Sequence, residues 1–410
     1  MQNVDIVIVG AGITGLWLLN RLHQTGYNVL LLEKDGIGSG QTLQSQGILH
    51  GGTKYALKGK QTHAAKALSD MPALWQACLN GAGEIDLTSV KILSHHHYLF
   101  SSGQFFGHLK NLVSSHALTH GRILKNKADF PTFFQNPAFK GSVSAIDETV
   151  LDVPSLMLAL TKPVMTRIIK TNDHTQFYPD SRGGLSHIDI QHNGQTHSIK
   201  PKRTILAAGE GNEAILSAFN NPPQMQRRPL HQVSIQFPKN TPSLELFAHC
   251  IGKGTKPLFT ITTHAAENGN TIWYVGGEIA EQGIENNSET QVKSTITQLK
   301  KHLPWVDFSG VTGTSFMINR AENKEPKGKK PNSFYVSTMA NMIATWPTKL
   351  VLVPALAKTI INTLATDLGK NAATQKIIQP LTNYPIAPIA TPKWSSLTCK
   401  KDNSDNLISG

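Results

Sequence analysis

The sequence predicts an α/β fold, α+β overall, in which a Rossmann-like nucleotide-binding domain carries an inserted antiparallel sheet. Three observations support it. A strand, a glycine-rich turn, a helix and a second strand fill the first 35 residues, strand-like runs recur across residues 231–276, and another strand ends on small residues at 204–209. At 410 residues the chain is long enough for two or three domains.

The N-terminal unit follows the order expected of a dinucleotide-binding segment. Val4–Val9 is a β-branched apolar run, typical of a buried parallel strand. The turn Gly10-Ala-Gly-Ile-Thr-Gly15 follows at once, and residues 16–25 are predicted to form a helix. Residues 27–32 form a second apolar strand that ends on Glu33. The unit is therefore strand, turn, helix, strand and acid.

Each residue type in this unit has a mechanical reason. Gly10 permits the tight turn, Gly12 lets the backbone approach a pyrophosphate, and Gly15 lets the helix pack against the strand. The helix N-terminus offers N–H groups to the phosphates. Glu33 can accept hydrogen bonds from both ribose hydroxyls, which disfavours the 2′-phosphate of NADP. The unit alone does not separate NAD from FAD.

The residues after Glu33 favour FAD. Residues 36–47 form a loop of small residues that leads into Ile48-Leu-His-Gly-Gly-Thr-Lys-Tyr55. This pattern resembles the D-amino-acid-oxidase / glycerol-3-phosphate-dehydrogenase superfamily of FAD-dependent oxidoreductases, and it is similar also to L-2-hydroxyglutarate oxidase. The resemblance implies that the loop runs along the pyrophosphate and under the flavin ring.

Three later segments are similar to the same superfamily. They are Thr149–Pro154 before an apolar helix, Thr204–Gly209 at a strand end, and Asn341–Lys349 before the predicted helix 350–363. A helix N-terminus at the last segment can stabilise charge on the reduced flavin. The motif and the resemblance together predict FAD contacts at Gly10, Gly12, Ile13, Thr14, Gly15, Glu33, Lys34, Thr42, Ser45, Gln46, Gly47, His50, Gly51, Ala208, Gly209, Thr345, Trp346, Thr348 and Lys349.

The last segment departs from the superfamily pattern, which usually has glycines there. Ala340 and Ala344 are tolerable if φ stays negative, and Trp346-Pro347 is bulky for a position beside a ring. The FAD is expected to be non-covalent, with covalent attachment through His50 as the alternative.

The predicted domains are discontinuous. Residues 1–85, 148–222 and 333–370 are assigned to the FAD-binding domain, residues 86–147 and 223–332 to the substrate domain, and residues 371–410 to an extended C-terminal tail. In the substrate domain, His231–Phe237, Leu258–Thr263 and Thr271–Gly276 are predicted strands, and Gln291–His302 is a predicted helix.

Four residues are predicted to act on the substrate. Arg320 resembles a superfamily arginine that anchors the substrate anion, and a guanidinium suits a carboxylate or phosphate; the alternative is a surface arginine paired with Glu322. His231 opens a strand where the resemblance implies a base near the substrate hydroxyl; the alternative is a hydrogen-bonded strand histidine. The resemblance to glycerol-3-phosphate dehydrogenases implies that Lys54 is a phosphate ligand; the alternative is a solvated lysine, and Tyr55 adjoins it.

Metal, disulfide and nucleic-acid sites are not predicted. Cys78, Cys250 and Cys399 are scattered and odd in number. His95, His96 and His97 are consecutive, so on a strand they alternate between faces, and no acidic partner is evident in the sequence. The formal net charge is +12, but the basic residues are spread along the chain without a basic aromatic patch.

The sequence thus predicts an enzyme that transfers hydride from a small anionic substrate, a 2-hydroxy acid or a polyol phosphate, to flavin N5. One alternative is an amino-acid or amine oxidase, and another is a non-catalytic flavoprotein that binds a protein partner. The chain starts on a predicted strand and has no run of ~18 apolar residues, so the cytoplasm is the expected compartment. The sequence leaves three questions undecided: whether the protein associates peripherally with the inner face of the membrane, whether its electron acceptor is oxygen or quinone, and what its oligomeric state is.

Overall fold

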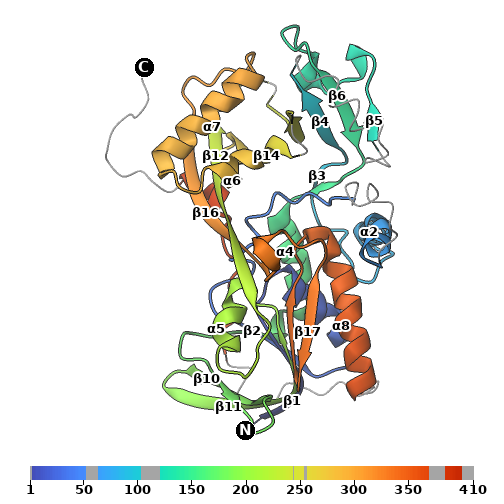
Figure 1. Cartoon of the computed structure of the whole chain (residues 1–410), viewed down its shortest axis with the longest axis vertical. Coiled ribbons are helices and arrows are strands. Elements are labelled where there is room, and N and C mark those ends of the chain that lie inside the picture. Colours follow the sequence, from blue (N-terminus) through green and yellow to red (C-terminus); the bar gives the residue numbers. More distant parts are fainter. Residues whose placement is uncertain are drawn as a thin grey trace.

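The computed structural model describes residues 2–51, 63–102, 121–242, 244–253, 256–368 and 384–398. Within these residues the chain forms two eight-stranded sheets and one small two-stranded sheet of β3 (Ile92–Ser94) and β7 (Val150–Leu151). The two large sheets occupy opposite ends of the molecule, and the long strand β12 (Met225–Phe237) runs from one end toward the other (Figure 1).

The first sheet is the predicted nucleotide-binding sheet. Its strand order is β17-β18-β11-β1-β2-β8, and β10 and β9 extend it by antiparallel pairing from β11. The strands β18, β11, β1, β2 and β8 are mutually parallel. Their bounds are β1 Gln2–Val9, β2 Val29–Glu33, β8 Ile168–Lys170, β9 Gln176–Pro179, β10 Leu185–His192, β11 Gln195–Leu206, β17 Tyr335–Met339 and β18 Met342–Trp346. The predicted strand–turn–helix–strand unit is confirmed.

Side chains along β1 alternate between the two faces of this sheet, and apolar clusters cover both faces. Ile6 and Ile8 belong to one buried cluster, and Val7 and Val9 belong to another on the opposite face. The first cluster includes residues of the helices α1 (Ile13–Gln24), α2 (His63–Leu79), α4 (Val153–Thr161) and α8 (Val353–Leu368). The second cluster includes residues of β10 and of the C-terminal segment, so both faces of β1 are buried from Val4 to Val9.

The second sheet is the predicted antiparallel sheet, and it recruits strands from two parts of the chain. Its order is β16-β12-β15-β14-β13-β4-β6-β5, and among these pairings only β13 with β4 is parallel. The bounds are β4 His97–Ser101, β5 Gly121–Ile123, β6 Ser142–Ile146, β13 Ala248–Ile251, β14 Pro257–Ala265, β15 Thr271–Gly276 and β16 Thr312–Asn323. The three predicted strands and the predicted helix, now α7 (Ser288–His302), are confirmed, while the exact domain boundaries stay a prediction.

The C-terminal segment 384–398 ties the two sheets together. Ile389 forms a parallel bridge with Ile37, and the Ala390 N–H donates to the Ile37 carbonyl at 3.0 Å. Trp394 lies 4.2 Å from His264 between ring centroids and belongs to the same buried cluster as Tyr274. The predicted tail is therefore packed across the molecule in this part; residues 371–383 and 399–410 lie outside the described residues.

One helical stretch meets the length and composition of a membrane span. Leu350–Leu368, which includes α8, has 19 residues, and 44% of its most apolar window is buried inside the structure. Its buried residues Leu356, Ile360 and Leu364 belong to the cluster that α1 and α4 also form. A core helix of a soluble protein meets the same two criteria, so the stretch is weak evidence for a membrane.

The turn between β17 and β18 corrects the expectation for Ala340. This residue has φ +46°, in the left-handed region, although the sequence pattern required a negative φ for an alanine. Replacing Ala340 with Gly removes the steric penalty and adds back some unfolded-state entropy. We expect Ala340→Gly to raise the free energy of unfolding by about 0.5–1 kcal/mol, measured by urea denaturation. An unchanged or lower value would show that the turn is not strained.

Candidate active site

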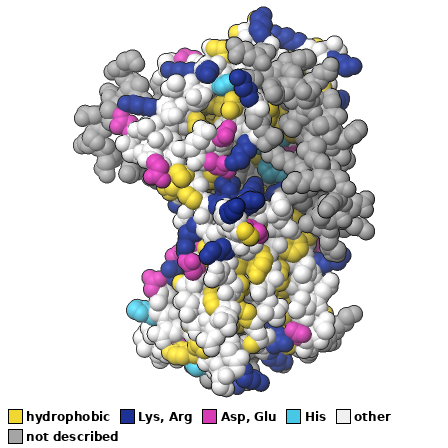
Figure 2. All heavy atoms as spheres, viewed as in Figure 1, with side chains coloured by type: hydrophobic (Ala, Val, Ile, Leu, Met, Phe, Trp, Pro, Cys, Tyr) yellow, Lys and Arg dark blue, Asp and Glu magenta, His cyan; other side chains and the backbone are white. Residues whose placement is uncertain are grey.

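A cavity of about 830 Å³ lies between the two sheets. Its walls come from the turn after β1, the end of β2, the loop 38–50, the segment after β11, the segment 346–351, and the faces of β12, β13, β14 and β16. Lys and Arg side chains gather in the narrow middle of the molecule, on the face that Figure 2 shows. The cavity thus has walls from both sheets, and its lining includes Lys34, Arg320, Lys330 and Lys349.

The glycine turn sets the first wall. Gly10 has φ +102°, and a Cβ there would stand 2.6 Å from the Ala208 Cα. A Cβ on Gly15 would stand 1.9 Å from the Gly10 carbonyl oxygen, so Gly15 lets α1 pack against the turn. Gly12 lines the cavity, and a Cβ there would contact only the Thr42 hydroxyl, at 3.3 Å. Gly10 and Gly15 therefore have the packing roles that the sequence predicts, and Gly12 lines the cavity, where its contact with a pyrophosphate stays a prediction.

Glu33 stands at the end of β2 and also lines the cavity. Its Oε2 accepts a hydrogen bond from the Ala11 N–H at 2.6 Å, and its Oε1 accepts one from the Asp35 N–H at 2.8 Å. Burial raises the pKa of Glu33, and these backbone donors offset part of that rise. The carboxylate is held in a fixed place at the cavity wall.

The loop 38–50 is fixed on both sides. Thr42 Oγ1 accepts from the Ile13 N–H at 3.1 Å, beside the N-terminus of α1. Gln46 Nε2 donates to the carbonyls of Thr260 and Tyr274, at 3.1 and 3.0 Å, in the second sheet. The loop thereby carries one wall of the cavity from the first sheet to the second.

The far wall comes from the ends of β11 and β18. Trp346 is fully buried and lines the cavity, and its Nε1 donates to the Gly209 carbonyl at 3.0 Å. Thr348 also lines it and has φ +57°, an uncommon conformation for a residue with a branched Cβ. Backbone strain of this kind gathers at binding sites. The bulky Trp346 is thus accommodated by turning its indole toward Gly209.

Most of the predicted FAD contacts line this cavity. They are Gly10, Gly12, Ile13, Thr14, Glu33, Lys34, Thr42, Ser45, Gln46, Gly47, His50, Ala208, Gly209, Trp346, Thr348 and Lys349. Gly15, Gly51 and Thr345 do not line it: Gly15 packs α1, the Gly51 N–H donates to Glu148, and the Thr345 hydroxyl donates to the Tyr335 carbonyl. Lys54 and Tyr55 lie outside the described residues.

Alternate residues of β12 and β16 form the side of the cavity next to the second sheet. Leu230 and Gln232 on β12, and Ile318 and Arg320 on β16, line it, with His249 on β13 and Thr260 on β14. The pairing register sets Leu230 opposite Ile318. Because neighbouring strand residues point to opposite faces, this arrangement turns His231 away.

His231 therefore does not have the predicted position near the substrate. Its Nδ1 lies 2.9 Å from the Gly283 carbonyl oxygen and its Nε2 lies 2.8 Å from the Ser315 hydroxyl. Its side chain is buried on the face that carries Val233 and Ile235 into the core of the second sheet. The alternative, a hydrogen-bonded strand histidine, is what the structure shows.

We expect His231→Ala to change stability rather than chemistry. The variant leaves the Gly283 carbonyl and the Ser315 hydroxyl without this partner, which should lower the free energy of unfolding by about 1–3 kcal/mol. Its bound flavin should be reduced by substrate at a rate within about threefold of the parent. Stopped-flow reduction checks the rate, and a loss of a hundredfold or more with full flavin content would restore His231 as the base.

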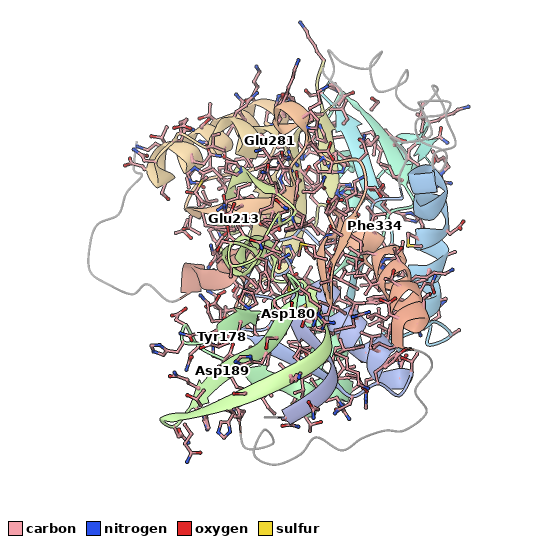
Figure 3. The ribbon with its side chains drawn as sticks, turned by 60° about the horizontal axis from the view of Figure 1, so that its bottom comes forward. Tyr178, Asp180, Asp189, Glu213, Glu281 and Phe334 are labelled. Carbon is pink, nitrogen blue, oxygen red and sulfur yellow. The ribbon has the colours of Figure 1, made fainter. Side chains whose placement is uncertain are left out.

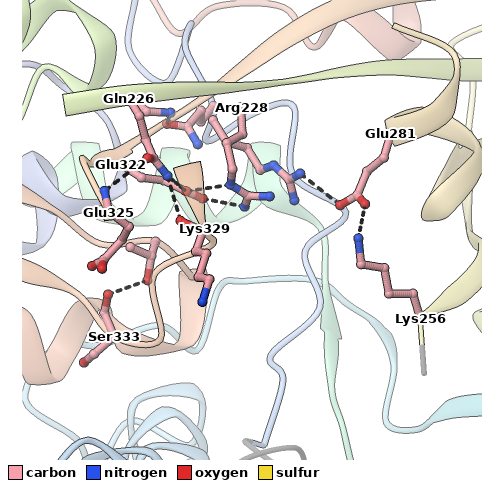
Figure 4. Close-up of polar contacts among 12 residues, drawn as sticks. Gln226, Arg228, Lys256, Glu281, Glu322, Glu325, Lys329 and Ser333 are labelled. Atoms are coloured by element: carbon pink, nitrogen blue, oxygen red, sulfur yellow. Dashed lines mark hydrogen bonds and ion pairs between the residues drawn. The ribbon is translucent and has the colours of Figure 1, made fainter. Parts of the chain in front are cut away.

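Arg320 reaches the cavity, but its ion pair differs from the predicted alternative. Its Nη2 donates to Glu281 at 3.1 Å, whereas Glu322 receives two hydrogen bonds from Arg228, at 2.7 and 2.6 Å (Figure 4). Glu281 also accepts from Lys256 at 2.6 Å. One carboxylate is therefore shared by two cations, and the positive charge of Arg320 is only partly compensated.

The environment of Arg320 favours a further anion. Burial and the neighbouring Arg228 lower the pKa of Arg320, and Glu281 opposes that shift. The Nε of Arg320 is buried and has no hydrogen-bond partner within the described residues. Arg320 lines the cavity with a charge that Glu281 only partly compensates, and a guanidinium of this kind is suited to a ligand carboxylate or phosphate.

A histidine–carboxylate pair stands on the same cavity. His50 lines it, and its Nδ1 lies 2.9 Å from Oε2 of Glu148, which is almost fully buried. The other oxygen of Glu148 accepts from the Gly51 N–H at 2.9 Å. Burial would raise the pKa of Glu148, but His50, His249 and the Gly51 N–H together hold that pKa below its usual value. Glu148 is therefore a carboxylate at neutral pH.

Two further histidines surround this pair. The rings of His50 and His249 are stacked with centroids 5.8 Å apart, and the His249 Nδ1 lies 2.7 Å from the Thr260 hydroxyl. His97 is fully buried with its ring centroid 4.2 Å from that of His249, and burial sets its pKa well below the ordinary value, helped by His249 and His50. Sequence reasoning missed Glu148 and His249, whose partners are distant in the chain.

Comparison with known proteins decides the family. Residues 5–314 match the family described as "DAO: FAD dependent oxidoreductase". Over 398 residues the chain is 36% identical to the probable FAD-dependent oxidoreductase PA4991 of Pseudomonas aeruginosa, which covers 96% of this chain and 97% of that protein. The chain belongs to the DAO family of FAD-dependent oxidoreductases. It is therefore an oxidoreductase with FAD as cofactor, as the sequence predicts.

Solved structures agree with this assignment. The crystal structure of PA4991 superposes with a TM-score of 0.80 at 33% identity, covering 97% of this chain and 99% of that one. The FAD-bound L-alpha-glycerophosphate oxidase of Mycoplasma pneumoniae has a TM-score of 0.63 at 14% identity, covering 96% and 98%. Glycine oxidase of Geobacillus kaustophilus has 0.61 at 13%, covering 92% and 100%. The last two likenesses show a shared fold, and the predicted fold class is confirmed.

The residues of this DAO-family chain fit FAD. The space in front of Gly12, the carboxylate of Glu33 and the N-terminus of α1 line one cavity. They suit an adenosine ribose and a pyrophosphate. The wall of Trp346, Thr348 and Lys349 leads to the side with Arg320 and His50. That end would hold the flavin ring.

Proposed function

We propose that this oxidoreductase oxidises the C–H bond beside a hydroxyl group on a small anionic substrate, a 2-hydroxy acid or a polyol phosphate. One observation carries the proposal: a carboxylate-oriented histidine, His50, and a partly compensated arginine, Arg320, line the same cavity. The first suits a hydroxyl proton and the second suits an anion. When bound, FAD supplies the hydride acceptor, N5.

Arg320 binds the anionic end of the substrate in this proposal. Its guanidinium can form two parallel hydrogen bonds to a carboxylate or phosphate. Glu281 accepts from Nη2 of this guanidinium but is shared with Lys256, so the charge of Arg320 is only partly compensated. The apolar side chains of Leu230 and Ile318 next to it exclude water and limit the size of the substrate.

His50 takes the hydroxyl proton in this proposal. With Nδ1–H donated to Glu148, the imidazole is held in the tautomer whose Nε2 can accept a proton. The Glu148 carboxylate then stabilises the imidazolium that forms. Removing the proton from the hydroxyl makes the neighbouring C–H a better hydride donor, and a positioned general base usually contributes ~10²–10⁴ in rate.

The proposal is tested by reducing the flavin anaerobically with a panel of 2-hydroxy acids, polyol phosphates and amino acids. We expect the flavin absorbance to bleach with a member of the first two groups. Bleaching by an amino acid alone would favour the amine-oxidase alternative. Protein that binds FAD but is reduced by no member of a broad panel would contradict the proposed substrate class.

A further inference from the structure

We propose that His50, His249 and Glu148 also form a binding site for one divalent transition-metal ion, with Zn²⁺ as its natural probe. One ligand atom from each of the three side chains lies within 4.8 Å of the other two. The inference goes beyond the proposed oxidation and does not depend on its substrate class. It also differs from the sequence prediction, which found no metal site.

The three side chains have the right chemistry for such an ion. Two imidazoles and one carboxylate are a common ligand set for zinc with an open fourth position. Zinc–ligand bonds of ~2.0–2.1 Å put ligand atoms about 3.3 Å apart in a tetrahedral site. Given the 4.8 Å limit on their present separation, ligand atoms need to approach by at most about 1.5 Å, while His50 Nδ1 and Glu148 Oε2, now 2.9 Å apart, would separate by about 0.4 Å.

The groups behind the ligands are already arranged as a metal site requires. Thr260 Oγ1 lies 2.7 Å from the His249 Nδ1, and this contact fixes the orientation of the His249 ring. The Gly51 N–H holds one oxygen of Glu148 at 2.9 Å, which leaves the other oxygen for the ion and His50. Outer hydrogen bonds of this kind orient metal ligands in proteins and strengthen binding 10–100-fold.

A second observation points to a ligand at this place. His97 packs against His249 and is fully buried, yet neither of its ring nitrogens has a hydrogen-bond partner within the described part of the chain. A buried polar group without a partner is uncommon and calls for a water or an ion nearby. An ion coordinated by His249, with its own bound water, would supply partners for the buried histidines.

The ion would sit on the cavity, because His50 and His249 both line it while Glu148 is buried behind them. The open fourth position would then face the cavity and take water or an oxygen of a small anion. If His50 accepts the substrate proton as proposed above, zinc would replace the proton that His50 shares with Glu148. Zinc would then inhibit oxidation, and a chelator would restore it.

The test measures zinc directly, in untagged FAD-bound protein stripped with EDTA and dialysed against ZnCl₂. We expect one zinc per chain, bound more tightly than about 100 µM, and at least tenfold weaker binding in Glu148→Gln and His249→Asn. His187→Asn is the matched control, because His187 pairs with Asp189 at 3.8 Å and does not line the cavity. Figure 3 shows Asp189 near one end of the molecule and Glu281, on the side of the second sheet, near the other. This control should bind zinc like the parent.

Zinc X-ray absorption on the parent protein covers the case in which a variant loses FAD or fails to fold. The expected spectrum has nitrogen and oxygen ligands at ~2.0–2.1 Å, the imidazole pattern of two histidines, and no sulfur. A stoichiometry near zero, a sulfur ligand, or Glu148→Gln and His249→Asn proteins that bind zinc like the parent would each overturn the inference. Flavin reduction by substrate is measured separately and tests the proposed function alone.

Discussion

Gly12→Val protein is expected to fold and to be purified without its yellow cofactor. The backbone of Gly12 is extended, with φ −72° and ψ 179°, which valine readily adopts. The first atom of a side chain there would meet only the flexible Thr42 hydroxyl. The rest of the valine would enter the cavity, at the place where the resemblance puts the pyrophosphate.

We therefore expect FAD content below about a tenth of the parent's, because a side chain cannot share the space that close backbone approach requires. Far-UV circular dichroism should stay close to that of FAD-free parent protein. The parent should release FAD rather than FMN on denaturation, since Glu33 stands where an adenosine ribose would lie. Gly12→Ala, with one added carbon, should lose less. Full FAD content in Gly12→Val would contradict this placement of the pyrophosphate.

The second large effect is expected from His50→Ala. If His50 accepts the substrate proton, the variant should bind FAD but be reduced by substrate about 10²–10⁴ times more slowly. Glu148→Gln should cause a smaller loss, because it keeps the shape of the side chain but no longer stabilises the imidazolium. Stopped-flow absorbance under anaerobic conditions gives both rates.

His96→Ala is the control for this series. His96 pairs with Asp147 at 3.2 Å, and both side chains are about half exposed or more. His96 and Asp147 thus form a histidine–carboxylate contact close in sequence to Glu148, but neither residue lines the cavity. Its loss should leave flavin reduction unchanged. A His50→Ala variant as fast as His96→Ala would remove His50 from the proposed chemistry.

The glycine turn and Glu33 were predictable because their signal is local. A tight turn, a close approach and an acid at a strand end all act within 35 residues, and the structure shows Gly10 in the turn, Gly15 packed against it, and Gly12 and Glu33 on the cavity wall. The order of the elements therefore identified the cofactor site without any knowledge of the rest of the fold.

His231 shows that the orientation of side chains on a predicted strand has to come from the structure. The strand was predicted, but residue type alone did not say which of two alternating faces meets the cavity. Pairing with β16 fixes that phase and presents Leu230 and Gln232 instead. Arg320 was placed on the correct face, but its partner is Glu281 from a helix 39 residues earlier.

No local sequence pattern marked Glu148 or His249 as residues of the site. Glu148 lies 98 residues from His50, and His249 comes from β13, whose parallel pairing with β4 brings it beside His97. Such a cluster exists only once both sheets are assembled, so spacing rules that detect metal sites along a chain could not find it. The packing of Trp394 against Tyr274 of the second sheet likewise depends on the assembled fold and has no local sequence pattern.

The central claim is that Arg320 holds the anionic end of a substrate whose hydroxyl-bearing carbon is oxidised by the flavin. The most direct measurement compares flavin reduction by an acid with reduction by its neutral amide, in the parent and in Arg320→Lys. We expect the acid to be strongly preferred by the parent. Arg320→Lys should need a much higher acid concentration, since lysine keeps the charge but loses the two-pronged contact. Equal reduction by acid and amide, or an Arg320→Lys variant indistinguishable from the parent, would contradict the claim.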